Sequence, residues 1–230
     1  MTKATMKKSG DKIKVLYHSD SSVVKTGFGR HAKALLSYLY KTGKYDIVQV
    51  CCSSIIGDPV LQSTPWKSIG AVTNDQQKLA KINQNPEKAR MAGYGKNTLD
   101  DVIAEEKPDV YFGVQDIWGI DFSVQKEWFR KIPSVLWTTL DSLPILPTAL
   151  KASKSCKNFW VWSNFAEKEM KRLGHNDVST VHGCFDTNQF FKVAPEVKKK
   201  LRNTFQIDED AFVIGFVFRN QLRKRSEERR

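Results

Sequence analysis

Three cations directly follow an apolar stretch near the C-terminus of the chain. Residues 212–218 read FVIGFVF, a run of strand length, and Arg219, Arg223 and Lys224 come next in the segment RNQLRK. Arginine offers a fork of N–H donors and lysine a point charge, which together suit the several oxygens of a diphosphate. These residues predict an anion site beside a buried strand. Because residues 225–230 add more arginines, a solvated basic tail is the alternative.

Two glycines open an amphipathic segment near the N-terminus. Gly27 and Gly29 lie in TGFGRHA, which fits the dinucleotide pattern G-x-G-x-x-[GA]. In that pattern the first glycine follows its strand directly and an acidic residue ends the second strand. Here residues 18–26 intervene and the second predicted strand ends in Cys-Cys-Ser. We therefore expect a helix start whose open N–H groups and dipole favour an anion, or else a plain turn before a helix.

Two further polar residues follow predicted strands. Asp141 lies in TTLDSLPILP, where a carboxylate before a proline-stiffened turn could contact a substrate hydroxyl or act as a base. An aspartate that only shapes the turn is the alternative. His182 lies between an apolar strand and Gly183. It could orient a sugar or a carbonyl, although a hydrogen-bonded structural histidine is the simpler interpretation.

Composition limits the classes of function. The chain has 230 residues and a net charge of +12, and residues 1–14, 192–202 and 219–230 each carry +4 of it, so no broad basic face is implied. No aromatic-interleaved basic patch points to nucleic acid. The four cysteines lack metal-ligand spacing and fit small buried hydrophobes in a reducing cytosol. Without a membrane-spanning run or a signal peptide, a cytoplasmic protein is expected.

Strand and helix signals alternate along the chain. Continuous apolar runs predict strands at residues 12–17, 47–52, 109–114, 134–139, 159–162, 178–181 and 212–218. Helices are predicted near residues 28–39, 99–103, 123–130, 148–153, 164–173 and 195–203, while residues 57–97 give no clear signal. Ser163 or Asn164 can cap the helix at 164–173, and Glu167 is placed to complete a capping box from Asn164. This order predicts a Rossmann-like, doubly wound α/β fold with a mainly parallel sheet covered on both faces.

Polar or glycine residues follow every predicted strand, as one polar cleft at the carboxyl edge of the sheet requires. The residues concerned are His18-Ser19-Asp20, Gln115-Asp116, Leu140-Asp141, Ser163-Asn164, His182-Gly183 and the basic loop. We expect a basic tail over residues 1–11, a Rossmann-like domain over 12–190, and a hinge with the beginning of a second α/β unit over 191–230.

Together these segments resemble the GT-B glycosyltransferases, within them the retaining group 1 (family 4) enzymes, over most of the chain. The matching pieces are the first strand with its glycine turn, the turn VLWTTLDSLPILP, and a hinge similar to HG-x-D-x-x-x-F that contains His182 and Asp186. FVIGFVFRNQLRK is similar to the first strand and basic loop of the donor domain. The resemblance implies transfer of a sugar from a nucleotide-sugar to a glycan, lipid or protein hydroxyl, without an obligatory metal.

The same resemblance implies roles for individual residues. Gly27 and Gly29 would approach the donor phosphates and the acceptor, and Arg219, Arg223 and Lys224 would hold the donor diphosphate. Asp141 would lie near the reacting sugar, where many relatives have His. His182 and Asp186 would be architectural. The chain departs from the family's pattern in two places. Phe218 stands where the family's loop has a glycine, and no counterpart of the paired donor-binding glutamates follows Lys224.

We therefore expect a fragment with little turnover alone. A non-catalytic remnant that binds a glycan or an anionic membrane surface through its basic N-terminus and residues 198–200 is the alternative. A nucleic-acid binder and a nicotinamide dehydrogenase are less favoured by the motifs.

Overall fold

The computed structural model describes residues 12–215. Within this range one sheet contains strands in the order β3-β2-β1-β4-β5-β6-β7, and each neighbouring pair is parallel. The strands are β1 (Ile13–Asp20), β2 (Tyr45–Ile55), β3 (Lys67–Val72), β4 (Val110–Val114), β5 (Ser134–Thr138), β6 (Asn158–Val161) and β7 (Val178–Thr180). Every residue of β5 is buried, which explains why its sequence is a continuous apolar run.

Helices connect the strands. The α-helices are α1 (Gly27–Lys41), α2 (Gln76–Asn83), α3 (Pro86–Gly93), α4 (Leu99–Glu106), α5 (Ile117–Ile120), α6 (Glu127–Lys131), α7 (Pro147–Ser153), α8 (Asn164–Arg172) and α9 (Pro195–Thr204). Two short 3-10 helices are η1 (Pro59–Ser63) and η2 (Asp121–Gln125). Thr26 caps the start of α1, and Gly43 follows it with a φ of 68°, a value that favours glycine.

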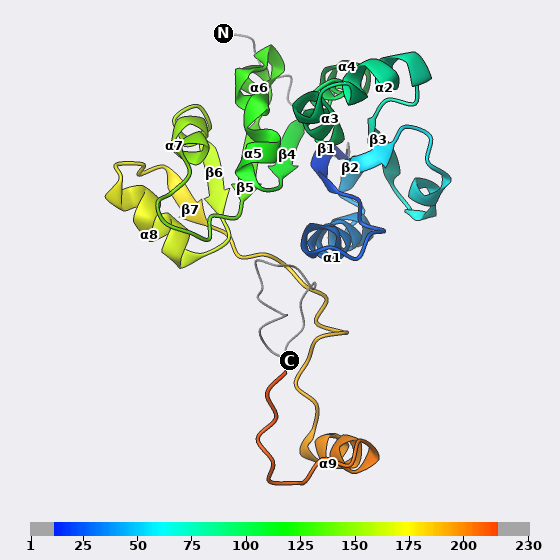
Figure 1. Cartoon of the computed structure of the whole chain (residues 1–230), viewed down its shortest axis with the longest axis vertical. Coiled ribbons are helices and arrows are strands. Elements are labelled where there is room, and N and C mark those ends of the chain that lie inside the picture. The colour runs from blue at the N-terminus through cyan, green and yellow to red at the C-terminus, as the bar shows by residue number, and fades with distance from the viewer. Residues whose placement is uncertain (1–11, 216–230) are drawn as a thin grey trace. The chain divides into compact units, whose positions relative to one another are not determined.

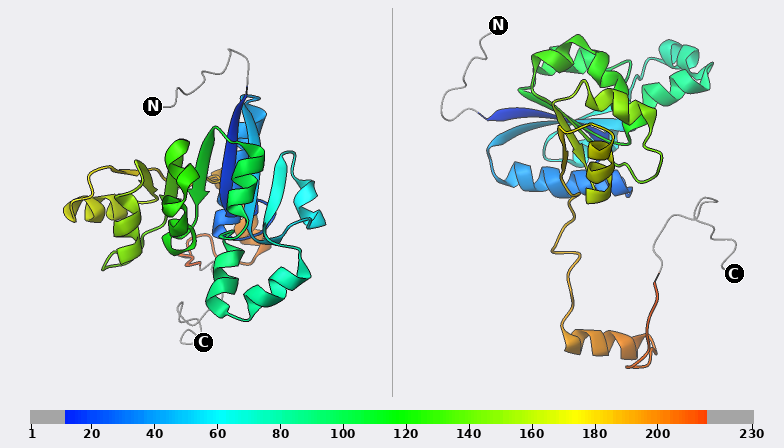
Figure 2. Two further views of the ribbon diagram at one scale, coloured as in Figure 1. Left: turned by 90° about the horizontal axis from the view of Figure 1, so that it is seen from above. Right: turned by 90° about the vertical axis from the view of Figure 1, so that its left-hand side faces the viewer.

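Both faces of the sheet are covered by helices (Figures 1 and 2). On one face, Leu36 of α1 packs in a cluster with Tyr17 and Trp137 of the sheet. On the other face, helices that include α4 and α7 bury Leu99 and Ala149 in a second cluster. Burial of a leucine side chain contributes about 1.5–3 kcal/mol to the free energy of unfolding. The parallel strands and the helices on both faces of the sheet confirm the predicted doubly wound, parallel α/β fold.

The chain order places a switch point between β1 and β4. From β1 the chain proceeds to β2 and β3 on one side, and then crosses to β4 on the other side of β1. Connections that leave neighbouring parallel strands in opposite directions open a crevice at the carboxyl ends of those strands, and ligands of open α/β sheets bind there. The exits of β1, β4 and the adjoining β5 are therefore the place to look for a site.

The first strand is longer than predicted. His18, Ser19 and Asp20, expected in a loop, continue β1 and pair in register with β2 as far as Cys52. Strands β1 and β2 remain parallel beyond the apolar run, so their hydrogen-bond ladder continues through polar residues. The side chains of these residues are hydrogen-bonded or buried. The expected exit at His18 is therefore wrong; the strand ends at Asp20.

Other boundaries also differ. Residues 57–97 contain η1, β3, α2 and α3, and β3 pairs with β2 at the edge of the sheet. The single helix predicted at residues 123–130 is instead a 3-10 turn, η2, followed by the short α6. Of the two predicted caps of α8, Ser163 is confirmed. The capping box from Asn164 is wrong, because Glu167 accepts the N–H of Thr180 and pairs with Lys171, at 2.7 Å and 2.6 Å.

The described chain divides into two units, one ending at Asp186 and the next beginning at Thr187, close to the predicted hinge. In residues 187–215 the regular element is α9, and Val197 and Leu201 on it and Phe205 directly after it are exposed. The strand predicted over residues 212–218 is wrong for its described part, since residues 211–215 form no strand. A strand needs a hydrogen-bonded neighbour, and residues 187–210 provide none. Among residues 12–215, no helix combines the length and apolar character needed to cross a bilayer.

Candidate functional site

Hydrogen bonds join the ends of β1 and β4 at the switch point. Gln115 Nε2 donates to Asp20 Oδ1 at 2.8 Å. The second carboxylate oxygen of Asp20 accepts the hydroxyl of Thr26 at 2.5 Å, and Thr26 Oγ1 in turn accepts the N–H of Gly29 at 3.0 Å. One carboxylate thus ties the start of α1 to the neighbouring strand.

The loop between β1 and α1 has a second anchor in Gln49, which is fully buried on β2. Its Nε2 donates to the carbonyl oxygen of Asp20 at 2.9 Å. Its Oε1 accepts Ser22 Oγ at 2.9 Å and Trp66 Nε1 at 3.1 Å. A buried amide with its groups satisfied fixes the loop in one arrangement, so this turn is preorganised before any ligand arrives.

The two glycines of the predicted anion site have different surroundings. A Cβ on Gly29 would lie 2.5 Å from the carbonyl oxygen of Val24 and 2.8 Å from that of Ser21. The chain's own packing therefore requires Gly29. A Cβ on Gly27 would meet nothing within 4 Å, and Gly27 is exposed. Gly27 thus leaves open space at the N-terminus of α1, where a ligand oxygen could approach.

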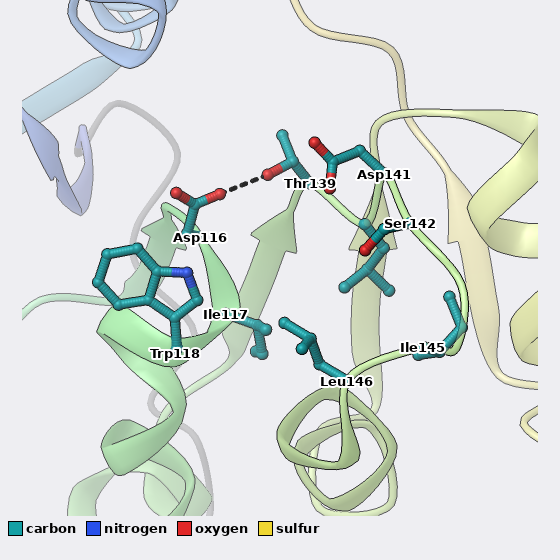
Figure 3. A pocket seen from close by; sticks show the side chains of 9 residues that line it. Asp116, Ile117, Trp118, Thr139, Asp141, Ser142, Ile145 and Leu146 are labelled. Atoms are coloured by element: carbon teal, nitrogen blue, oxygen red, sulfur yellow. Dashed lines mark hydrogen bonds between the residues drawn. The ribbon is translucent and has the colours of Figure 1, made fainter. Parts of the chain in front are cut away.

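A pocket lies between the exits of β4 and β5 (Figure 3). It is lined by the polar residues Asp116, Thr139, Asp141 and Ser142, the aliphatic residues Ile117, Leu140, Ile145 and Leu146, and Trp118. Thr139 Oγ1 donates to Asp116 Oδ1 at 2.6 Å. The cavity volume is about 60 Å³, comparable with two water molecules at roughly 30 Å³ each. It can therefore hold part of one small polar ring and cannot enclose a nucleotide.

The loop after β5 displays Asp141 because both of its ends are buried. Leu140 and Ile145 insert into the core cluster, and only 5% and 4% of their surfaces are exposed. Asp141 and Ser142 between them are exposed. Pro147 then begins α7 at its first position. Two apolar anchors thus hold a short polar segment over the pocket.

Trp118 stands on the other side of the pocket, 38% exposed. The guanidinium carbon of Arg90 lies 5.1 Å from its ring centroid, and Tyr94 packs edge-on against it at 5.2 Å. A Cβ on Gly119 would lie 2.8 Å from the ring of Tyr94, so Gly119 permits this packing. Burial raises the pKa of Tyr94 to about 12, which keeps its ring neutral. The indole is therefore held in a fixed position.

His18 points into the core rather than into the crevice. Its Nδ1 is 2.9 Å from the hydroxyl of Tyr111, and its Nε2 has no hydrogen-bond partner among the described residues. Burial lowers the pKa of His18 to about 4, so the imidazole is neutral at pH 7. Since neither nitrogen reaches the pocket, the structure gives His18 no contact with a ligand there.

The predicted hinge begins as a segment that packs against the aromatic residues of the sheet. Trp137 Nε1 donates to the carbonyl oxygen of Val181 at 2.8 Å, and His182 Nδ1 lies 3.0 Å from the carbonyl oxygen of Trp162. A Cβ on Gly183 would lie 2.6 Å from the Trp162 ring. This geometry is that of a packed connection, and it gives His182 an architectural contact. Asp186 lies half-buried just beyond.

The hinge also brings a cysteine beside a histidine. Cys184 Sγ is 3.5 Å from His31 Nε2, and His31 Nδ1 is 3.0 Å from the hydroxyl of Tyr17. Burial lowers the pKa of His31 to about 4 and raises the pKa of Cys184. Both groups are therefore neutral at pH 7, and the pair is a packing contact rather than an activated thiolate.

The three cations of the predicted diphosphate site, Arg219, Arg223 and Lys224, lie outside the described residues. Among residues 12–215, no group of three or more His, Cys, Asp and Glu side chains is arranged to hold a metal ion. The structure brings Asp141 together with Asp116, which was expected in the same cleft, and with Thr139 and Trp118, which the sequence did not single out. The available signal was their position directly after β4 and β5.

A scan of protein-family models gives no match to this chain, and a search of curated proteins gives none either. Solved structures with a similar fold include a UDP-N-acetylglucosamine 2-epimerase at 13% identity, with a TM-score of 0.48 over 75% of this chain and 49% of that one. A second, assigned as this epimerase from Listeria monocytogenes, has 16% identity and a TM-score of 0.44, with 71% and 42% covered.

A third, the UDP-GlcNAc 2-epimerase from Methanocaldococcus jannaschii, has 12% identity and a TM-score of 0.41, with 75% and 46% covered. The chain spans less than half the length of each of these structures.

Proposed function

We propose that this chain is the acceptor-binding part of a retaining GT-B glycosyltransferase of the group 1 (family 4) type. The observation that supports it most is the pocket at the exits of β4 and β5, where Asp116 and Asp141 lie beside the switch point of a parallel sheet. Carboxylates accept hydrogen bonds from hydroxyl groups, so the pocket is suited to an alcohol. The sequence motifs support the family, and the polar lining of the pocket supports an acceptor site.

The charge of this rim favours an acceptor over a diphosphate. Asp20 ends β1, and Asp116 and Asp141 follow the adjacent strands β4 and β5. Carboxylates repel phosphate oxygens. In the proposed enzyme the donor diphosphate is instead held by Arg219, Arg223 and Lys224, as the resemblance implies. Gly27, at the open start of α1, is available to an oxygen of either substrate.

In the proposed reaction an acceptor hydroxyl enters the pocket and hydrogen-bonds Asp141. Its proton passes to the carboxylate while its oxygen bonds to the anomeric carbon of the donor sugar on the face from which the diphosphate leaves, so that the configuration is retained. The bond between that carbon and the donor diphosphate breaks, and the leaving diphosphate carries the electron pair. Cations of the basic loop stabilise that charge. Asp116, fixed by Thr139, orients the hydroxyl.

Product analysis tests this function. The 230-residue chain and the longest polypeptide that contains it are incubated with a panel of labelled nucleotide-sugars and hydroxyl acceptors. Transfer predicts a free nucleoside diphosphate and a new glycosidic bond with the anomeric configuration of the donor, with little turnover from the 230-residue chain alone. An epimerised sugar still bound to its nucleotide, or hydrolysis without transfer in the longer polypeptide, would refute it.

A further inference from the structure

We infer that the pocket between β4 and β5 seats part of one uncharged pyranose ring, so that the acceptor is a carbohydrate and not a lipid or peptide hydroxyl; this rests on the function proposed above. Three observations support this assignment. They are an aliphatic floor under polar walls, a fixed indole at the rim, and a volume that suits part of a single ring.

The lining of the pocket is divided by polarity. In the view of Figure 3, Ile117, Ile145 and Leu146 lie below Asp116 and Asp141, which lie on opposite sides of the pocket. A pyranose has the same division, with axial C–H groups on its faces and hydroxyls around its edge. The aliphatic side chains can cover a C–H face while the carboxylates accept from ring hydroxyls.

Hydrogen-bonding capacity also matches a polyol. Thr139 occupies one oxygen of Asp116, and Asp141 is exposed, so carboxylate oxygens remain for hydroxyl donors. Figure 3 shows the ring nitrogen of Trp118 on the side of the indole that faces the pocket. Its N–H can donate to a hydroxyl or ring oxygen, so the site offers both kinds of partner that a sugar needs.

The rim is built before the sugar arrives. Arg90 and Tyr94 pack against the indole of Trp118 and fix its position. On the opposite side of the pocket, Leu140 and Ile145 anchor the loop that carries Asp141 and Ser142. A site with locked side chains loses little entropy on binding. Such order favours a small rigid ring over a flexible chain.

Other ligands fit less well. An acyl chain would need a long apolar groove, whereas this cavity is about 60 Å³ and half its wall is polar. A phosphate or nucleotide would meet the charges of Asp116 and Asp141. A peptide would need backbone partners along an extended surface. A neutral sugar is therefore the ligand class that fits the pocket best.

NMR titration of the 230-residue chain tests this assignment. Methyl glucoside, galactoside and mannoside are the probes, with hexanol, a serine tripeptide, UDP and inorganic phosphate as comparisons. The readout is the indole N–H signal of Trp118, which is assigned by its loss in Trp118→Phe. We expect a glycoside to shift it with a dissociation constant in the millimolar range, while the comparisons leave it unchanged. Asp141→Asn and Ser142→Ala should weaken binding at least about fivefold, and the helix-cap control Asp75→Asn should not.

The experiments distinguish failure of the pyranose site from failure of the proposed transferase function. The inference is overturned if no glycoside shifts the Trp118 signal up to about 100 mM, which is weaker than a millimolar site allows, or if the shift survives in Asp141→Asn combined with Ser142→Ala. It is also overturned if the longer polypeptide transfers sugar only to lipid or peptide hydroxyls, although the proposed function then stands. Glycoside binding without transfer in the longer polypeptide leaves this site intact and refutes the transferase.

Discussion

Alanine at the two glycines of the α1 turn should have opposite effects on stability. In Gly29→Ala the new methyl carbon would lie 2.5 Å from the Val24 carbonyl oxygen and 2.8 Å from that of Ser21, closer than any ordinary contact. The loop must shift, and overpacking of this kind costs about 1–3 kcal/mol. In Gly27→Ala the methyl meets open space, so reduced freedom of the unfolded chain should stabilise the protein by about 0.4–1 kcal/mol.

Urea unfolding of the 230-residue chain, followed by far-UV circular dichroism, measures both effects. Gly27→Ala serves as the matched control for Gly29→Ala, because the two differ in surroundings and not in chemistry. In the longer polypeptide, Gly27→Ala should also lower kcat/KM for transfer if a substrate oxygen approaches α1 there. Equal stabilities of the two variants, or a Gly27→Ala protein that is less stable than Gly29→Ala, would refute the packing argument.

Further predictions concern the core, the hinge and α9. Acidification should lower the free energy of unfolding, because the pKa of His18 and of His31 falls from 6.5 to about 4 on folding. Only the unfolded chain then gains protons between these values, at a cost near pH 5 of about 2 kcal/mol per histidine. Urea melts of His31→Gln should depend less on pH, and an unchanged slope would contradict this. Gly183→Ala should destabilise by about 1–3 kcal/mol through its clash with Trp162, whereas an unaltered melting curve would show that the hinge yields freely. The exposed residues 198–200 predict salt-sensitive retention on anionic vesicles, and equal retention on neutral vesicles would argue against it.

The sheet could be predicted because its signals are local. Apolar runs such as residues 134–138 identify strands that are buried on both faces. The sequence KSIGAV of β3 is mixed and follows Pro65 and Trp66, as suits an edge strand, and it gave no comparable signal. The polar end of β1 was placed in a loop because its stability comes from residues far along the chain, including the contact of His18 with Tyr111.

The candidate site could be predicted only in part. Asp141 was identified from its position after a strand, and the structure places it on a pocket. The bond between Thr139 and Asp116 joins residues 23 positions apart, and Trp118 is fixed by Arg90 from another helix. Such contacts follow from the crossing of β4 over to the far side of β1, which no local pattern reveals.

The most direct test of the central claim is the steady-state kinetics of Asp141→Asn in the longest polypeptide that contains this chain. Removing a general base costs typically about 10²–10⁴-fold. We predict that Asp141→Asn lowers kcat for sugar transfer by at least about 100-fold, while Asp75→Asn, an exposed helix cap, has no effect. Wild-type kcat in Asp141→Asn, with both variants folded by circular dichroism, would contradict the assignment of this pocket to the reacting hydroxyl.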